Sequence, residues 1–115
     1  MEISDRQSGN ATIVDVNGDI TLRNTPDVRN ALLNLLRDKR TLRLIVNMDR
    51  VRYIDSAGIA SLVEALRVSR DLKKGFALFG ISNVVQQVLE LTRLTTVFEI
   101  HGSEAEALEA GASGS

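Results

Sequence analysis

The chain has 115 residues, 43% hydrophobic and 25% charged, proportions that indicate one globular domain with a real core rather than a disordered chain. Fourteen Lys and Arg against fifteen Asp and Glu give a formal net charge of -1, and aromatic residues are few. Without a basic excess or stacking platforms for bases, nucleic-acid binding is not expected, and without cysteine neither disulfides nor a thiolate metal site can hold the fold.

The sequence carries no sign of export. Residues 1–9 lack the basic-then-apolar pattern of a signal peptide, and no apolar run approaches the length of a membrane span. The absence of cysteine fits a reducing compartment. We therefore expect a cytoplasmic protein that does not insert into membranes, and nothing in the sequence demands more than a monomer.

The N-terminal segment predicts paired strands. Residues 11–16 (ATIVDV) have the apolar, β-branched character of a strand, and residues 2–6 can pair with them across a turn at residues 8–10. Residues 17–18 (NG) allow two interpretations, a second hairpin turn or a kink in one long strand. The sequence does not separate these two.

A first helix is expected to begin at Thr25, which can cap it, with Pro26 in the first helical position. Apolar residues at helical spacing then form one face. These residues are Val28, Ala31, Leu32, Leu35 and Leu36. Leu33 falls off this face, and we expect it on the surface, where an isolated leucine needs no partner.

Residues 42–48 (LRLIVNM) are almost continuously apolar, which is typical of a strand covered on both faces. A second helix follows, with an apolar stripe of Ile59, Leu62, Val63 and Leu66. We expect it to end at residues 73–75, where two lysines meet the negative end of the helix and Gly75 takes the left-handed cap.

The C-terminal part continues the alternation. Residues 76–79 (FALF) predict another buried strand, Ser82 can open a third helix, and residues 97–100 (VFEI) predict a last edge strand. Ser103 and Glu106 have the spacing of a capping box, so a short helix should close the domain.

Strands that alternate with helices imply right-handed crossovers and a mainly parallel sheet. The predicted fold class is therefore α/β, a small mixed, mainly parallel sheet flanked by about four helices, with an antiparallel N-terminal strand. We expect one domain over residues 1–110 and a disordered tail of small residues over 111–115.

No motif for enzyme chemistry is assembled in the sequence. A P-loop and a dinucleotide fingerprint are absent, and the acidic residues Asp15, Asp19, Asp49 and Asp55 lack metal-ligand spacing. His101 is the only histidine, and no G-x-S-x-G elbow accompanies it. We expect no cofactor, no metal and no catalytic residue; a serine hydrolase using Ser56 and His101 is a distant alternative.

Residues 53–59 (YIDSAGI) join a predicted strand to the second helix, the place in such sheets where ligands and partners are usually met. The simpler interpretation is structural, because Asp55 and Ser56 stand where a helix N-cap is needed. The functional interpretation is that Ser56 accepts a phosphoryl group near the positive end of the helix. The new charge beside Asp55 would release a closely packed partner without unfolding the domain.

Several blocks in the same order resemble the STAS domain family, and within it the bacterial anti-sigma factor antagonists. The blocks are VNGDIT at residues 16–21, TPDVRNALLNLL at 25–36, LRLIVNMDRVRYIDSAGIASL at 42–62 and FALFGISNVVQQVLELTRL at 76–94. Together the resemblance covers roughly residues 3–109. It implies a small mixed sheet flanked by helices and phosphorylation of the serine in an Asp-Ser-x-Gly motif, which by position is Ser56.

The resemblance also implies partner switching. The unphosphorylated antagonist binds an anti-sigma factor and so frees a sigma factor. The anti-sigma factor is itself an ATP-dependent serine kinase that inactivates the antagonist, and a metal-dependent serine phosphatase restores it. This chain would be substrate and ligand, not catalyst.

Four positions depart from the family pattern. Acidic residues are usual where this chain has Thr21 and Asn47, both expected toward the phosphorylation surface, so kinase recognition can differ. A second serine is frequent where this chain has Ala57, which leaves Ser56 as the sharper candidate. Arg93 replaces a glycine that commonly ends the third helix.

We expect the partner surface to combine the loop over residues 21–25 with the first turns of the second helix. Gly58 would let a partner's backbone come close, while the helical register of Ile59 favours a place in the core. The candidate partner-binding residues are Thr21, Asn24, Thr25, Asp55, Ser56, Ala57, Gly58, Ile59 and Ser61.

Two alternatives stay open. STAS domains also serve as adaptor subunits of lipid-transporting ABC systems and in stress-sensing assemblies, where no phospho-switch is required. Separately, Arg67, Arg70 and Lys74 follow one another at helical spacing, which is typical of a solvated face with weak ion pairs but also suits an acidic partner.

Overall fold

The computed structural model describes residues 1–113 and contains a five-stranded sheet and four helices within that range. In chain order the elements are β1 (Glu2–Ser8), β2 (Ala11–Asn17), α1 (Thr25–Arg37), β3 (Arg43–Arg50), α2 (Ser56–Asp71), β4 (Gly75–Phe79), α3 (Asn83–Leu91), β5 (Glu99–His101) and α4 (Glu104–Ser113). The strands lie in the order β1-β2-β3-β4-β5; β1 is antiparallel to β2, and the other neighbours are parallel. The predicted α/β class is confirmed.

The chain does not form a second hairpin after β2. Gly18 has a φ of 125°, and two residues later Ile20 pairs with Ile54 in a parallel bridge, the same sense in which β2 pairs with β3. The chain therefore bends but keeps its direction, which favours the kink over the hairpin.

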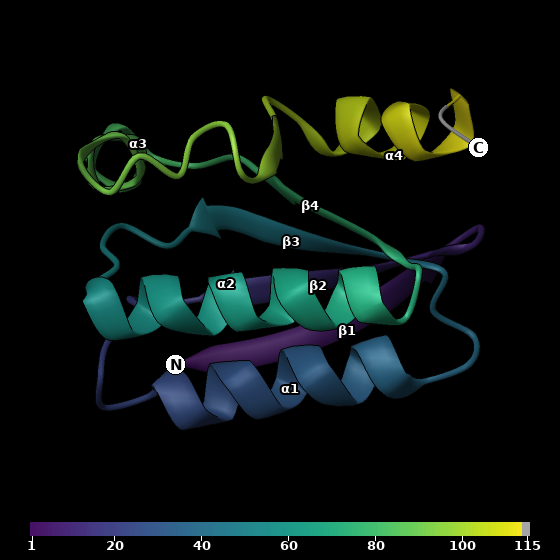
Figure 1. Cartoon of the computed structure of the whole chain (residues 1–115), viewed down its shortest axis with the longest axis horizontal. Coiled ribbons are helices and arrows are strands. Elements are labelled where there is room, and N and C mark those ends of the chain that lie inside the picture. The colour runs from purple at the N-terminus through teal and green to yellow at the C-terminus, as the bar shows by residue number, and fades with distance from the viewer. Residues whose placement is uncertain (114–115) are drawn as a thin grey trace.

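The main core lies between the sheet and the helices α1, α2 and α3. Alternate residues of each strand point to this face, as the pleat of a strand requires. They include Val14, Val16, Leu44, Val46 and Met48. Figure 1 shows α1 and α2 side by side along the sheet, both beginning at the same end of the molecule. Leu33 is only 4% exposed and belongs to this core, so its expected surface position is wrong; α1 packs against both the sheet and α2 and buries a wider face.

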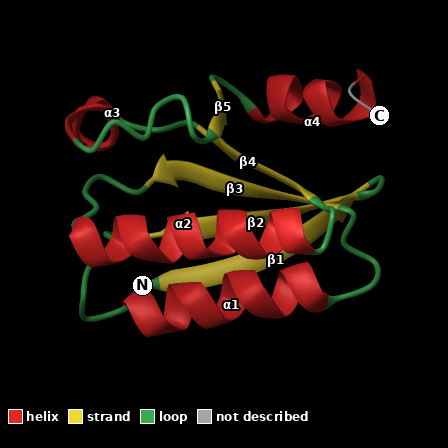
Figure 2. Ribbon diagram, in the orientation of Figure 1, coloured by secondary structure: helices red, strands yellow, loops and turns green. Residues whose placement is uncertain are grey.

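The opposite face of the sheet carries a second, smaller core. Its apolar residues are Ala11, Ile13, Ile45, Ala77 and Phe79, together with Ala107 of α4. Figure 2 shows α4 apart from the α1–α2 pair. Within residues 1–113 no helix is long and apolar enough to cross a membrane.

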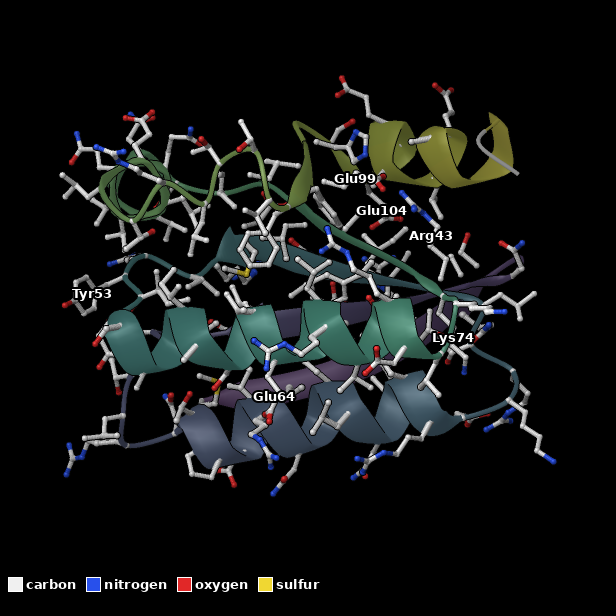
Figure 3. All side chains as sticks on the ribbon, viewed as in Figure 1. Arg43, Tyr53, Glu64, Lys74, Glu99 and Glu104 are labelled. Atoms are coloured by element: carbon white, nitrogen blue, oxygen red, sulfur yellow. The ribbon has the colours of Figure 1, made fainter. Side chains whose placement is uncertain are left out.

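Arg43 of β3 lies beneath α4 and helps to hold it on this face. Its guanidinium donates to the carboxylate of Glu99 and, at 2.9 Å, to the carbonyl of Ala107 (Figure 3). A Cβ at Gly111 would come within 2.4 Å of Arg43 Cδ, so a larger residue at position 111 would have to displace the Arg43 side chain. Residues 111–113 are thus helical where the sequence predicted the start of a disordered tail; residues 114 and 115 lie outside the described range.

The helices α2 and α3 end in the same way. The amide of Lys74 donates to the carbonyl of Ser69 and that of Leu94 to Leu89, the six-to-one bond of a Schellman motif. The left-handed position in each motif is held by a non-glycine residue with φ 59°, Lys73 after α2 and Arg93 after α3. The predicted left-handed cap at Gly75 is therefore wrong: Gly75 already begins β4.

Lys74 has a structural role of its own. Its Nζ donates to the carbonyl oxygens of Leu36 and, at 2.8 Å, Asp38 at the end of α1. These carbonyls have no partner within the helix, and the cation also meets the negative end of the helix dipole. Lys74 thus fastens the end of α1 to the end of α2 and is not part of a cationic surface for partners.

We expect Arg93→Gly to stabilise the fold by about 0.5–1 kcal/mol, because glycine takes a left-handed conformation without the steric cost that arginine meets there. The midpoint and slope of urea unfolding measure the change. Arg70→Gly, inside α2, is the matched control and should lose about 1 kcal/mol. An Arg93→Gly variant that is less stable than the wild type contradicts the prediction.

Candidate functional site

The candidate site lies where the parallel strands end, in two loops that the backbone ties together. The amide of Ile20 donates to the carbonyl of Tyr53 at 3.1 Å, and the amide of Asp55 donates to the carbonyl of Ile20 at 3.1 Å. The loop before α1 and the loop before α2 are thereby held edge to edge. This confirms that the segments around Thr21 and Ser56 form one surface.

Asp55 is the N-cap of α2 and joins the two loops through its carboxylate. One oxygen accepts from the amide of Gly58 at 2.9 Å, and the other accepts from the amide of Leu22 at 3.0 Å. These backbone hydrogen bonds, first that of Gly58 and then that of Leu22, hold the pKa of Asp55 below its ordinary value. The expected capping role is confirmed, and the carboxylate of Asp55 also holds the loop at Leu22 against the start of α2.

Ser56 is the first residue of α2, and its side chain is exposed. Its hydroxyl makes no hydrogen bond to any group within residues 1–113. At this position a group attached to the oxygen lies near the positive end of the helix. Ser56 thus presents a hydroxyl that a second protein can reach without disturbing an internal contact.

Three of the expected partner-binding residues are buried. Ile59 and Ser61 are each 5% exposed, and Gly58 is also buried. A Cβ at Gly58 would lie 2.6 Å from Ile54 and 2.7 Å from the carbonyl oxygen of Ile20. Gly58 therefore serves the close packing of α2 onto the two loops rather than the approach of a partner.

The residues at the start of α1 organise the first loop. Asn24 accepts from the amide of Thr21 at 2.9 Å and donates to the carbonyl of Asp19 at 2.6 Å. Asn24, not Thr25, is the N-cap residue of α1, so the predicted cap is wrong. The Thr25 hydroxyl instead bonds the hydroxyl of Ser61 and, at 3.2 Å, the carbonyl of Ala57, which ties the first turn of α1 to α2.

Sequence reasoning missed two exposed apolar side chains that flank Ser56. Leu22 is 73% exposed in the first loop, and Tyr53 is 47% exposed in the second (Figure 3). Large apolar residues at such positions are typical of contacts with partners. A large apolar residue beside an arginine in each loop, Leu22 before Arg23 and Tyr53 after Arg52, was the signal that could have identified them.

Asn47 lies near the end of β3, on the sheet face opposite α2, and lines a pocket with residues of the two loops. Its expected place toward the phosphorylation surface stays a prediction. Its amide donates to the carboxylate of Asp15 at 2.8 Å, and its oxygen accepts from the amide of Asp49 at 3.0 Å. Asp15 already pairs with Arg6 at 2.7 Å. An acid at position 47 would face the Asp15 carboxylate directly, which accounts for the neutral amide.

The structure does not assemble a serine–histidine pair. His101 Nε2 lies 2.7 Å from a carboxylate oxygen of Glu99, and no hydrogen bond joins the histidine to Ser56. Within the described residues, no three His, Asp or Glu side chains gather to hold a metal ion.

Replacement of Asp55 by asparagine should lower the free energy of unfolding at pH 7. The asparagine side chain has only one acceptor oxygen, whereas the two carboxylate oxygens of Asp55 each accept from a different backbone amide. The depressed pKa of Asp55 stabilises the fold above about pH 4, the unfolded value, and this contribution is lost as the pH falls through the folded value. The difference in free energy of unfolding between wild type and Asp55→Asn, measured with urea, should therefore be smaller at pH 3 than at pH 7. Asp19→Asn is the control, and an Asp55→Asn difference that is independent of pH contradicts the prediction.

Comparison with known proteins places this geometry in a family. Residues 2–107 match the model of the STAS domain. The anti-sigma-B factor antagonist of Listeria monocytogenes is 30% identical over 106 residues, 92% of this chain and 91% of that protein.

Two solved structures share the fold. An anti-sigma-factor antagonist (STAS) domain protein from Planctomyces limnophilus has a TM-score of 0.86 at 19% identity, covering 96% of this chain and 97% of that one. The Bacillus cell fate determinant SpoIIAA in its phosphorylated form has a TM-score of 0.71 at 15% identity, covering 94% and 97%. The family match over nearly the whole length, together with the Asp-Ser-x-Gly motif at the mouth of α2, establishes that the chain belongs to the STAS domain family.

Proposed function

We propose that this protein is an anti-sigma factor antagonist, which binds an anti-sigma factor when unphosphorylated and thereby releases a sigma factor. The observation that carries the proposal is Ser56, an exposed hydroxyl at the first position of α2 with no internal partner within residues 1–113. The name of the Listeria relative supports the same role.

Phosphorylation of Ser56 switches the protein off. A phosphate at this position carries about -1.5 to -2 charges at neutral pH and stands next to the Asp55 carboxylate. The helix end can accommodate it, so the fold survives. A partner packed over Leu22 and Tyr53 would have to desolvate the same charge, and the complex therefore dissociates.

The enzymes of this cycle are the partners. The anti-sigma factor acts as an ATP-dependent serine kinase, and a metal-dependent serine phosphatase restores the hydroxyl. ATP and metal belong to these enzymes, and the present chain is ligand and substrate. The partner-binding residues that remain on the surface, fully or half-exposed, are Thr21, Asn24, Thr25, Asp55, Ser56 and Ala57.

The test is phosphopeptide mass spectrometry after incubation of the chain with ATP and a lysate of its own host. We expect one phosphate on Ser56 that is absent from Ser56→Ala. The wild-type chain should capture the anti-sigma factor, whereas Ser56→Asp should bind it at least tenfold more weakly. The captured kinase, once purified, must phosphorylate the chain on its own.

Ser69→Ala is the matched control, because Ser69 lies on the same helix, outside the candidate site, with a buried hydroxyl that donates to the carbonyl of Leu66. It should be phosphorylated at Ser56 like the wild type. An unmodified Ser56 together with stable capture of a transporter ATPase would overturn the proposal and indicate a STAS adaptor without a phospho-switch.

A further inference from the structure

A groove runs between α1 and α2, beginning one residue beyond Ser56. We call it the α1–α2 groove; it has a volume of about 530 Å³ and is lined by Thr25, Arg29, Ala57, Ala60, Ser61, Val63, Glu64 and Arg67. Its floor consists of small and apolar side chains of α2, and Ala60 is exposed in it. Glu64 points from α2 toward α1 in Figure 3 and marks the middle of the groove.

The charges along the groove are unequal. Glu64 is its one carboxylate, and Arg29 of α1 pairs with it, one guanidinium nitrogen lying 3.2 Å from a carboxylate oxygen. The pKa of Glu64 is lowered, first by the hydrogen bond from Arg29 and further by the nearby charges of Arg67 and Arg37. The lining of the groove thus carries two guanidinium groups, those of Arg29 and Arg67, and one carboxylate.

Arg67 is the cation that the groove leaves available. Within residues 1–113 it makes no hydrogen bond and no ion pair, although it lies close enough to Glu64 to act on it through space. Glu64 is already engaged by the guanidinium of Arg29. The groove therefore combines an apolar floor with an uncompensated positive charge.

We propose that the α1–α2 groove binds an acidic segment of the anti-sigma factor, with an aliphatic side chain on the floor at Ala60 and a carboxylate on Arg67. The occupant follows from charge complementarity, because an acidic segment meets the excess of guanidinium groups and a basic one is repelled by it. This inference rests on the proposed function and names the chemistry that the partner presents beside Ser56.

The groove also connects the partner to the switch. An acidic segment that enters at Ala57 passes directly beside Ser56 and Asp55. A phosphate on Ser56 has the same sign of charge as this segment and faces it at short range, where screening by salt is weak. The phosphate thus repels the part of the partner that the arginines attract.

The test uses the purified anti-sigma factor that phosphorylates Ser56, with the dissociation constant measured by calorimetry at two salt concentrations. Arg67→Glu should weaken binding about tenfold or more, and binding of the wild type should weaken as salt rises. Glu64→Gln should act in the opposite direction and tighten binding, because it removes the one carboxylate of the groove. Circular dichroism and urea unfolding verify that each variant is folded.

Arg70→Glu is the matched control, since it makes the same charge change on α2 at a residue that does not line the groove. It should bind within about twofold of the wild type. Equal effects of Arg67→Glu and Arg70→Glu, or wild-type binding by Arg67→Glu, overturn the groove as the docking site.

The phosphorylation state of Ser56 distinguishes a failure of this inference from a failure of the proposed function. If Ser56 is phosphorylated and the unphosphorylated chain binds the kinase while Arg67→Glu binds as well as the wild type, only the groove fails. If Ser56 is never modified and no anti-sigma factor binds the wild type, the proposed function fails and the groove with it.

Discussion

The site depends on one carboxylate, that of Asp55, which accepts hydrogen bonds from two backbone amides in distant parts of the chain. Asp55 holds the amide of Gly58 in its own helix and that of Leu22, 33 residues earlier, in the neighbouring loop. Backbone donors are fixed in position, so this arrangement specifies where both loops lie. Ser56 follows immediately and inherits a defined position although its own side chain is bound to nothing within residues 1–113.

The close approach of α2 to these loops leaves no room at Gly58, and the small side chains of Ala57, Ala60 and Ser61 line the groove between α2 and α1. The same residue types serve two purposes. Inside, they allow tight packing; outside, they leave the shallow apolar floor on which a partner can rest. The motif around Ser56 is thus a packing motif as much as a recognition motif, and the short sequence pattern serves both at once.

Local patterns were enough to predict most of the elements. The strands follow from short apolar runs. The helix that begins after Ser82 follows from its apolar periodicity and from Ser82 as its N-cap, and the structure confirms these elements. The failures concern contacts between distant residues. Thr25 looks like a cap until Ser61 is found beside it, and Gly111 looks like part of a disordered tail until Arg43 is seen beneath it. Leu22 and Tyr53 could be recognised as a pair only once the two loops were seen to adjoin.

The two helices that border the groove are fastened to each other at three levels. Thr25 bonds Ser61 at their beginnings, Arg29 pairs with Glu64 in the middle, and Lys74 holds the carbonyls that end α1. Such a pair has little freedom to splay or slide before a ligand arrives. Binding to it costs less conformational entropy than binding to a surface that must first be ordered, so even a modest contact area can give useful affinity. The lysine far from the serine thus contributes to recognition through rigidity alone.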